Sequence, residues 1–437
     1  MNIYTVEEAK KTILQRRALN RTAYSPVTLQ RTEEFFGRGI TPPKAVEIIL
    51  QSVEDFGDSA IHKWSALLDG FEAEKIVVTQ SELELAWNEL PQRLQQAMQS
   101  AADRIRSFHQ KQPIQNWLTA ELGGQIGQRF TPIERVGVYV PGGTAPLPSS
   151  LLMSVIPAQV AGVGNIAIAT PPVPALSILA AAYLCEVDAV YQIGGAQAIA
   201  AMAFGTESVQ KVDKIVGAGN LFVTLAKQQL FGVVGMEGLA GPTETMVIAD
   251  QSANPEWVAA DLLAQAEHDV QASAILLTPV PELAKSVQTK VSEMISKLSR
   301  KEIIQASLEN AGGIVVTESI VQAAELANDY GAEHLCLSVQ QPEALMEKIN
   351  HAGGFFLGDH SFEVLGDYVA GPSHIMPTGG TARFASPLNV LDFVKISSVI
   401  GLDPNTAGAL SSIAAELAEL EQLTAHAAAA RFRLEEK

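Results

Sequence analysis

A long stretch without any charged residue constrains the fold of this chain most. Between Arg135 and Glu186 there is no Asp, Glu, Lys, Arg or His. Charge alone would suggest a membrane protein, but prolines divide the stretch into pieces too short to span a bilayer as helices. Short apolar strands that alternate with apolar helices are typical of a parallel sheet covered on both faces. The stretch therefore predicts a buried α/β core.

The apolar pattern predicts two successive α/β units. In the first unit we expect strands at residues 136–140, 166–170, 189–193 and 214–216, with helices between them. In the second we expect strands at 245–249, 274–278, 314–317, 335–339 and 354–357. Strands that alternate with helices imply right-handed parallel crossovers, so each unit is expected to be an incomplete, Rossmann-like, doubly wound sheet.

Glycine-rich turns follow three strands of the first unit, at residues 142–143, 194–195 and 217–219. Open α/β sheets bind ligands at such turns, although tight packing turns look the same in sequence. None of the three completes the dinucleotide-binding fingerprint of three glycines. A nicotinamide cofactor is therefore permitted here but is not indicated by the turns alone.

The chain length predicts several domains. We expect a helical arm at residues 1–24 and a helical segment at 25–130 that joins the second α/β domain and ends in a polar linker. The first α/β domain is expected at 131–240, the second at 241–380, and a helical dimerisation segment at 381–437.

Composition excludes several classes of partner. The chain has 48 acidic and 30 basic residues and a net charge of −18, which disfavours nucleic acid and anionic membranes as partners. Cys185 and Cys336 lie in apolar runs, which predicts buried reduced thiols. No apolar segment follows a basic one at the start, so we expect a cytoplasmic enzyme without a secretory signal.

A helix that starts at Asn254-Pro255 carries the first candidate site. Gln265 and His268 are three residues apart, so on a helix their side chains project from one face. An amide oxygen and an imidazole are half of a four-ligand site for a metal such as zinc. Taken alone, the same pair is more often hydrogen-bonded at a domain contact.

Three further sequence features carry groups suited to acid–base or metal chemistry. Glu333 and His334 stand where a helix gives way to a strand, which suits proton transfer, although a surface pair would look the same. A loop rich in Gly and Pro bears Asp367 and His374 and could complete a metal site.

The C-terminal segment carries Glu421 and His426. A lone histidine followed by alanines usually faces solvent, so this feature is weak by itself. Together with Gln265, His268 and Asp367, however, His426 makes a nitrogen and oxygen donor set that suits a divalent cation, zinc best, with manganese or cobalt as substitutes.

Linked motifs give the chain a specific resemblance. These are Tyr139-Val140-Pro141-Gly142-Gly143, Gly194-Gly195-Ala196-Gln197-Ala198, Gly241-Pro242-Thr243-Glu244, Leu263-Ala264-Gln265-Ala266-Glu267-His268, Gly331-Ala332-Glu333-His334-Leu335, Gly366-Asp367-Tyr368 and Leu423-Thr424-Ala425-His426. In this order and spacing the chain resembles the histidinol dehydrogenases over nearly its whole length. The resemblance implies a zinc- and NAD-dependent homodimer that oxidises L-histidinol to L-histidine through histidinaldehyde by two hydride transfers, the last step of histidine biosynthesis.

The resemblance also implies roles for residues. One zinc per subunit would be held by Gln265, His268, Asp367 and His426. His334 would be the base for the alcohol proton, and Glu333 would activate the water that hydrates the aldehyde. Substrate contacts would come from these four ligands and from Thr243, His334 and Glu421, with His374 nearby.

By the same resemblance, Tyr139, Gln197 and Asn220 of the first α/β domain would contact NAD. The C-terminal segment would cross to the partner subunit, so that Glu421 and His426 serve the partner's site in an intertwined dimer. The chain departs from the family pattern at Thr243, where serine is usual, and at Ala218, where proline is usual.

Two alternatives remain open from sequence. A paralogue on the same scaffold could oxidise another small amino- or sulpho-alcohol with zinc and NAD. A zinc-stabilised dimer without catalysis is the other alternative, although such a scaffold has no need of both Glu333 and His334.

Overall fold

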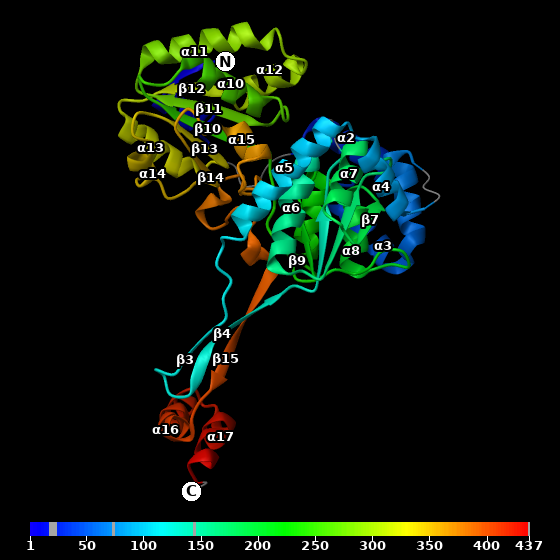
Figure 1. Ribbon diagram of the computed structural model, residues 1–437, viewed down its shortest axis with the longest axis vertical. Helices are drawn as coiled ribbons and strands as arrows, with labels where there is room; N and C mark the ends of the chain where they lie inside the picture. The colour runs from blue at the N-terminus through cyan, green and yellow to red at the C-terminus, as the bar shows by residue number, and fades with distance from the viewer. Residues whose placement is uncertain (17–23, 72–74, 143–145, 436–437) are drawn as a thin grey trace.

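The computed structural model describes residues 1–16, 24–71, 75–142 and 146–435. They form two α/β domains and an arm that ends in two helices far from both domains (Figure 1). Gly143 and residues 17–23 of the expected N-terminal arm lie outside the described residues.

The first domain is built on a six-stranded sheet. Its strands lie in the order β2 (Val77–Val78), β7 (Ala189–Gln192), β6 (Asn165–Thr170), β5 (Arg135–Tyr139), β8 (Lys214–Val216) and β9 (Gly235–Met236). All neighbours are parallel except β2, which runs antiparallel to β7. The charge-free stretch supplies β5, β6 and the helices that follow them, as the sequence predicted.

Helices cover both faces of this sheet. Val136 and Val138 of β5 pack toward α5 (Gln92–His109), α6 (Pro148–Ala161) and α7 (Leu176–Leu184). Tyr139, which points to the other face, packs with α3 (Pro42–Trp64), α8 (Gly195–Phe204) and α9 (Leu221–Leu230). This alternation follows from the two-residue period of a strand, and burial on both faces explains why the strands lack charges.

The second domain repeats the plan with a fully parallel sheet. Its order is β1 (Ile3–Thr5), β12 (Gly313–Val316), β11 (Ser273–Thr278), β10 (Glu244–Ala249), β13 (His334–Ser338) and β14 (Gly354–Leu357). One face packs against α10 (Pro255–Ala266), α11 (Pro281–Ile295) and α12 (Lys301–Asn310). The other packs against α1 (Val6–Lys11), α13 (Ile320–Tyr330) and α14 (Pro342–Met346), and α15 (Glu363–Tyr368) lies beside α10.

The N-terminal segment differs from the expected helical arm. Residues 3–5 are strand β1, which adds to the edge of the second sheet beside β12, and only α1 is helical. Arg16 then forms an ion pair with Glu244 at the start of β10. The start of the chain is thus part of the second domain.

The prediction that residues 25–130 join the second domain is wrong. α2 (Pro26–Phe36), α3 and the π-helix η2 (Ser65–Asp69) lie on the α8–α9 side of the first domain, whereas α4 (Gln80–Glu89) packs on α7 and α5 on α6. The apolar faces of these helices complete the two cores of the first domain. From α5, the Arg104 guanidinium donates hydrogen bonds to the carbonyl oxygens of Val369, 2.6 Å, and Ala370, 3.4 Å, in the segment that follows α15.

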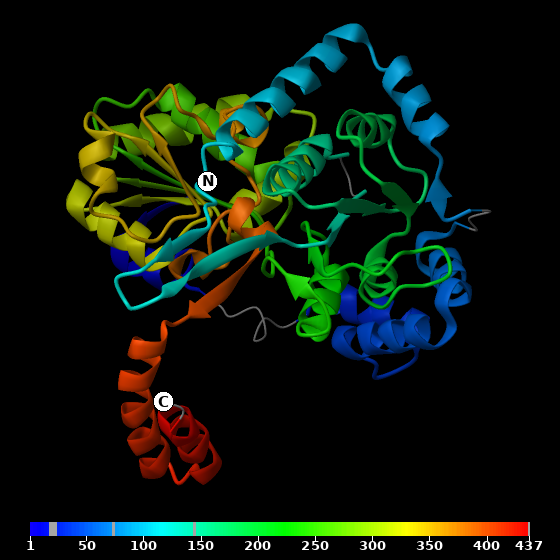
Figure 2. The ribbon, with the colours of Figure 1, turned by 60° about the horizontal axis from the view of Figure 1, so that its bottom comes forward.

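The arm is a three-stranded antiparallel sheet followed by two helices. The predicted polar linker contains β3 (Trp117–Thr119) and β4 (Gln125–Pro132), and the segment predicted to be helical contains β15 (Val394–Gly401) after the short turns η3 (Thr381–Arg383) and η4 (Val390–Phe393). All of β15 pairs with β4. α16 (Pro404–Leu420) and α17 (Thr424–Glu435) then project from the body (Figure 2). None of the described helices is long and apolar enough to span a membrane.

Candidate functional site

The candidate site lies at the amino ends of β10 and β13 in the second sheet. Thr243 and Glu244 lead into β10, and Glu333 and His334 lead into the neighbouring β13. The register pairs Thr245 with His334. Parallel pairing of β10 with β13 therefore brings the two segments together.

Glu333 is buried and accepts two hydrogen bonds. Its Oε2 lies 2.6 Å from the hydroxyl oxygen of Thr243 and 2.9 Å from the backbone nitrogen of Glu244. Burial raises the pKa of Glu333 to about 7, although His334 and these two donors lower it in part. A carboxyl group with a pKa near neutrality can both accept and release a proton at physiological pH.

His334 is buried between three carboxyl groups. Its Nδ1 lies 3.2 Å from the carbonyl oxygen of Glu244 and 3.7 Å from Glu333 Oε2. Its Nε2 is buried without a hydrogen-bond partner among the described residues, and the nearest carboxylate oxygen, Asp367 Oδ1, is 3.8 Å away. The contact at Nδ1 orients the imidazole ring, and Nε2 is left available to bind or accept a proton.

Gln265 and His268 do not share a helix face. α10 ends at Ala266, so Gln265 is buried on its last turn, whereas His268 is exposed in the turn beyond the cap residue Glu267. The sequence pattern continued the helix one turn too far. Both residues nevertheless border the same cluster, because His268 interacts electrostatically with Asp367 and His334.

Asp367 lies on a different structure from the one expected, whereas His374 lies in the expected loop. Asp367 belongs to helix α15 and not to the Gly- and Pro-rich loop, which begins after it. His374 is in that loop: its Nδ1 lies 2.7 Å from the carbonyl oxygen of Asp367, and its Nε2 lies 3.0 Å from Ser150 Oγ. Because Ser150 is in α6, His374 links the first domain to the segment that carries Asp367.

The C-terminal candidates lie elsewhere in the same chain. Glu421 and His426 are exposed at the junction of α16 and α17, at the end of the arm (Figure 1). Among the described residues of a single chain, no group of three His, Cys, Asp or Glu side chains is arranged to hold a metal. One chain thus brings Gln265, His268 and Asp367 to one place but not His426.

The three residues expected to contact NAD lie in the first domain, near the carboxyl ends of its strands. The Tyr139 hydroxyl accepts a hydrogen bond from the backbone nitrogen of Gly195, 3.1 Å. Gln197 Nε2 donates to Asp69 Oδ2, 3.2 Å, and its buried Oε1 has no partner among the described residues. Asn220 caps α9, and its Oδ1 accepts from the backbone nitrogens of Phe222 and Val223.

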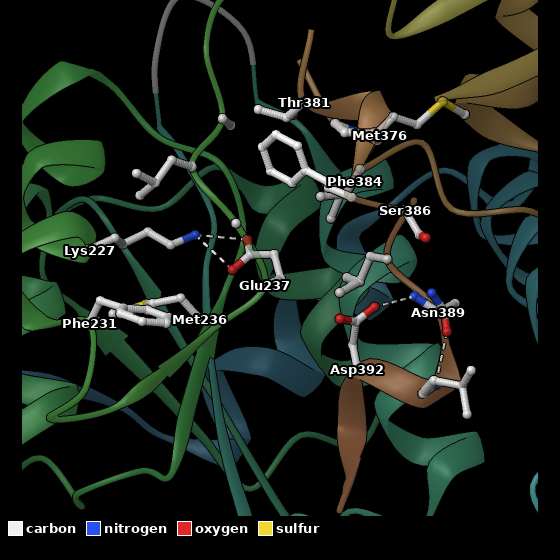
Figure 3. Close-up of a pocket in the computed structure, with 18 of the residues that line it drawn as sticks. Lys227, Phe231, Met236, Glu237, Met376, Thr381, Phe384, Ser386, Asn389 and Asp392 are labelled. Atoms are coloured by element: carbon white, nitrogen blue, oxygen red, sulfur yellow. Dashed lines mark hydrogen bonds and ion pairs between the residues drawn. The ribbon is translucent and has the colours of Figure 1, made fainter. Parts of the chain in front are cut away.

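A buried ion pair supports the turn that carries Asn220. Lys227 Nζ on α9 lies 2.8 Å from both carboxylate oxygens of Glu237 and 3.0 Å from the carbonyl oxygen of Gly217. Figure 3 shows this pair on the wall of a cavity of about 780 Å³, which lies between residues 227–240 and residues 375–392. The opposite wall includes Phe384 and Asn389, which precede the arm.

Comparison with known proteins tests the resemblance directly. Residues 40–434 match the family model for histidinol dehydrogenase. The chain is 48% identical over 411 residues to a histidinol dehydrogenase of Dehalococcoides mccartyi, covering 93% of this chain and 94% of the relative. It is 48% identical to that of Aquifex aeolicus, covering 89% and 92%. The chain belongs to the histidinol dehydrogenase family.

A solved structure supports the fold of this family member. The crystal structure of histidinol dehydrogenase from Elizabethkingia anophelis superimposes with a TM-score of 0.90 at 35% identity and covers 100% of this chain and 98% of the other. The predicted family and the predicted α/β class with parallel sheets are therefore confirmed, as is the prediction that the protein is an oxidoreductase.

Sequence reasoning missed several residues of this histidinol dehydrogenase family member. Asp69 reaches Gln197 from η2, and Glu363 of α15 lies in the cluster around Gln265 and His334. Neither has a local signal, because each depends on a helix packed from elsewhere in the chain. Lys227 did have one: it is the one charged residue in the otherwise uncharged 221–230 helix.

Proposed function

We propose that the protein oxidises L-histidinol to L-histidine through histidinaldehyde, with two NAD molecules reduced per substrate. One observation carries the proposal: His334 Nε2 is buried, has no partner among the described residues, and faces Asp367 across 3.8 Å beside the buried Glu333. An available imidazole nitrogen next to a second base of neutral pKa suits a reaction with two different proton abstractions.

The donor atoms around this nitrogen fit a zinc ion. Gln265, His268 and Asp367 offer an amide oxygen, an imidazole nitrogen and a carboxylate, which are zinc donors. In our proposal these residues and His426 of the partner subunit hold one zinc per subunit. When bound, zinc holds and orients the amino alcohol.

In this proposal two residues of the chain each carry out one of the two proton transfers. His334 accepts the alcohol proton at Nε2, while its Nδ1 is held near the Glu244 carbonyl oxygen. Glu333 removes a proton from the water that hydrates the aldehyde. The hydrogen bond from Thr243 to Glu333 fixes the position of that carboxylate, and Thr243 in turn is close to Gln265.

The cofactor contacts belong to the first domain in this proposal. Tyr139, Gln197 and Asn220 bind NAD, which accepts a hydride in each step. The unpartnered Gln197 Oε1 is an acceptor suited to a donor group of such a ligand. In this proposal residues 131–240 form the NAD side, and residues 241–380 form the metal and catalytic side.

An intertwined homodimer completes the proposed site. The arm exposes many large apolar side chains, namely Ile396, Ile400, Leu410, Ile413, Leu417, Leu420, Leu423 and Phe432. An apolar surface of this kind marks a protein–protein contact. Placing the arm on a second subunit would bury it and bring Glu421 and His426 to that subunit's site. The cytoplasmic location stays a prediction.

The stoichiometry of NADH tests the function. L-Histidinol is added in limiting amount with excess NAD, and NADH is counted by absorbance at completion. Two NADH per histidinol are expected. One NADH per histidinol would indicate a simple alcohol dehydrogenase, and no NADH with any amino alcohol would indicate a zinc-stabilised dimer without catalysis. Comparison of several amino and sulpho alcohols separates a paralogue from a histidinol enzyme.

A further inference from the structure

Glu363 is a buried carboxyl group without a role in the reaction described above. It is the first residue of α15 and only 1% exposed. The same helix carries Asp367 one turn later, so the two acidic side chains share one side of α15. Burial of a carboxyl beside other acidic groups costs stability unless its oxygens are well satisfied.

Both oxygens of Glu363 have hydrogen-bond donors. The hydroxyl of Thr245 on β10 donates to Oε2. The Gln265 amide nitrogen donates to Oε1 when the amide is oriented to satisfy all its neighbours. The ring nitrogen Nδ1 of His334 is 4.0 Å from Oε1. Glu363 therefore has polar partners but no Lys or Arg in ion-pair contact in the described part of the chain.

This contact decides which way the Gln265 amide points. With its nitrogen engaged by Glu363, the amide oxygen accepts a hydrogen bond from the backbone nitrogen of Glu244, 2.8 Å. It also lies 2.5 Å from the hydroxyl oxygen of Thr243, whose one proton is donated to Glu333. In the reverse orientation the amide oxygen would face a carboxyl oxygen and the amide nitrogen would face a backbone N–H. Only the oxygen of an amide can ligate a divalent cation, because the nitrogen has no free lone pair.

We propose that Glu363 is a positioning residue of the metal site, which holds the Gln265 amide with its nitrogen occupied, so that a lone pair of its oxygen is left for the cation. The inference rests on the metal site of the proposed function. Partners that orient the ligands of a metal typically change its affinity by about 10–100-fold when removed.

Zinc affinity of the full-length protein tests the proposal. Zinc is titrated into chelator-treated wild-type, Glu363→Met and Glu363→Gln proteins in competition with a chromophoric zinc chelator. Methionine fills similar volume but accepts no hydrogen bond, so E363M is expected to bind zinc about 10–100-fold more weakly. E363Q retains an amide oxygen that can accept from Gln265 and an amide nitrogen that can donate to Thr245. It is expected to bind zinc with nearly wild-type affinity.

Unfolding of the metal-free proteins separates positioning from a structural role. Because E363M removes a buried carboxyl near Asp367, its metal-free form should unfold at the same or a higher denaturant concentration than wild type. Wild-type zinc affinity in E363M would overturn the proposal. An E363Q protein as weak as E363M would do so as well, because it would show that charge matters and amide orientation does not.

Two further variants keep the test decisive. Thr245→Val retains Glu363 but removes the hydroxyl that holds it, so zinc affinity should fall in the same direction even if E363M fails to fold. Gln265→Ala tests the metal site itself. If Q265A binds zinc like wild type, the cation is not at Gln265 and the proposed function loses its metal assignment. If Q265A is weakened and E363M is not, only the positioning role fails.

Discussion

Lys227 and Glu237 form a buried ion pair that holds both backbone groups of Gly217. Lys227 Nζ donates to the Gly217 carbonyl oxygen, and the Gly217 nitrogen donates to Glu237 Oε1 at 2.7 Å. Gly217 has φ +104°, and a Cβ there would collide with the carbonyl oxygen of Tyr139. The ion pair thus fixes a glycine turn that leads to Asn220 and lies against Tyr139.

Loss of the lysine should weaken both the fold and the cofactor side. In Lys227→Met, the partly buried Glu237 loses its cation, and removal of one partner of a buried ion pair costs up to about 3–5 kcal/mol. We expect the free energy of unfolding, measured with urea, to fall by this amount. The KM for NAD should rise more than the KM for histidinol, because the turn carries Asn220, a proposed NAD contact. The proposed histidinol contacts lie in the second domain and in the partner's arm.

A surface pair is the matched control for this variant. Lys290 and Glu293 pair at 3.1 Å on the surface of α11, so Lys290→Met should leave the urea unfolding midpoint close to that of wild type. The double variant K227M/E237L should recover much of the lost stability, since no charge stays buried. Equal rises of both KM values in K227M would contradict a specific link to the cofactor turn.

His334→Asn should affect the first oxidation most. Asparagine keeps a polar group but cannot accept the alcohol proton, and loss of a general base typically slows a reaction by about 10²–10⁴-fold. Single-turnover formation of the first NADH from histidinol measures this step. His351→Asn, outside the site, is the control. A first oxidation at the wild-type rate in H334N would exclude His334 as the base.

Glu333→Gln should mainly impair the second half-reaction. The amide cannot take a proton from water, so oxidation of supplied histidinaldehyde should slow more than oxidation of histidinol. In wild type the aldehyde step should rise with pH through the region near 7, where burial has raised the pKa of Glu333. Equal losses in both half-reactions for E333Q would contradict this division of labour.

Asp261 on α10 should make stability depend on pH. Burial and then the nearby charge of Asp359 raise the pKa of Asp261 to about 7, whereas in the unfolded chain a free aspartate titrates near about 4. The folded protein therefore holds a proton that the unfolded chain has lost. The stability that this proton provides is complete below about pH 4 and is lost as pH rises through about 7.

Urea unfolding of the metal-free protein at pH 5 and pH 8 measures the effect. Wild type should lose more stability over this interval than Asp261→Asn, which has no carboxyl to ionise. Asp103→Asn, at an exposed position of α5, should follow wild type. If D261N and wild type lost equal stability over the interval, Asp261 would not be the group responsible.

Mixed dimers test whether the arm serves the partner. His334→Asn damages the body of the site and His426→Ala damages the arm. If each site combines one body with the partner's arm, a dimer of the two variants contains one intact site. After unfolding and refolding together in equal amounts, about one quarter of wild-type activity should return, because half of the randomly assembled dimers are mixed. No recovery would mean that each arm serves its own subunit.

The sequence predicted the two sheets because their strands are buried on both faces. β8 and β14 have the predicted bounds, and the other predicted strands differ by a residue at their ends. The arm strands β4 and β15 were missed because few of their residues are buried, which leaves no apolar alternation to detect. Amphipathic helices such as α3 likewise show that a face is buried but not which domain covers it.

The residue types of the site were predictable from the sequence, but the residues that hold those side chains in place were not. The linked motifs pointed to Gln265, Asp367, Glu333 and His334, which the fold brings to one cluster. The end of α10 was misplaced because Leu263 and Ala266 continue the helical spacing up to a cap that has no glycine or proline. Glu363 could not be found, since its contacts with Gln265 and Thr245 exist only when α15 lies against α10 and β10.

The pairing of β4 with β15 joins residues 125–132 to residues 394–401. During translation, β4 leaves the ribosome long before its partner is made and has only the short β3 beside it. Its outer edge stays open through the synthesis of both α/β domains, and open edges recruit strands from other chains. A fragment that ends at Phe393 should therefore accumulate as aggregates, even though it contains every buried residue of the cores of both domains.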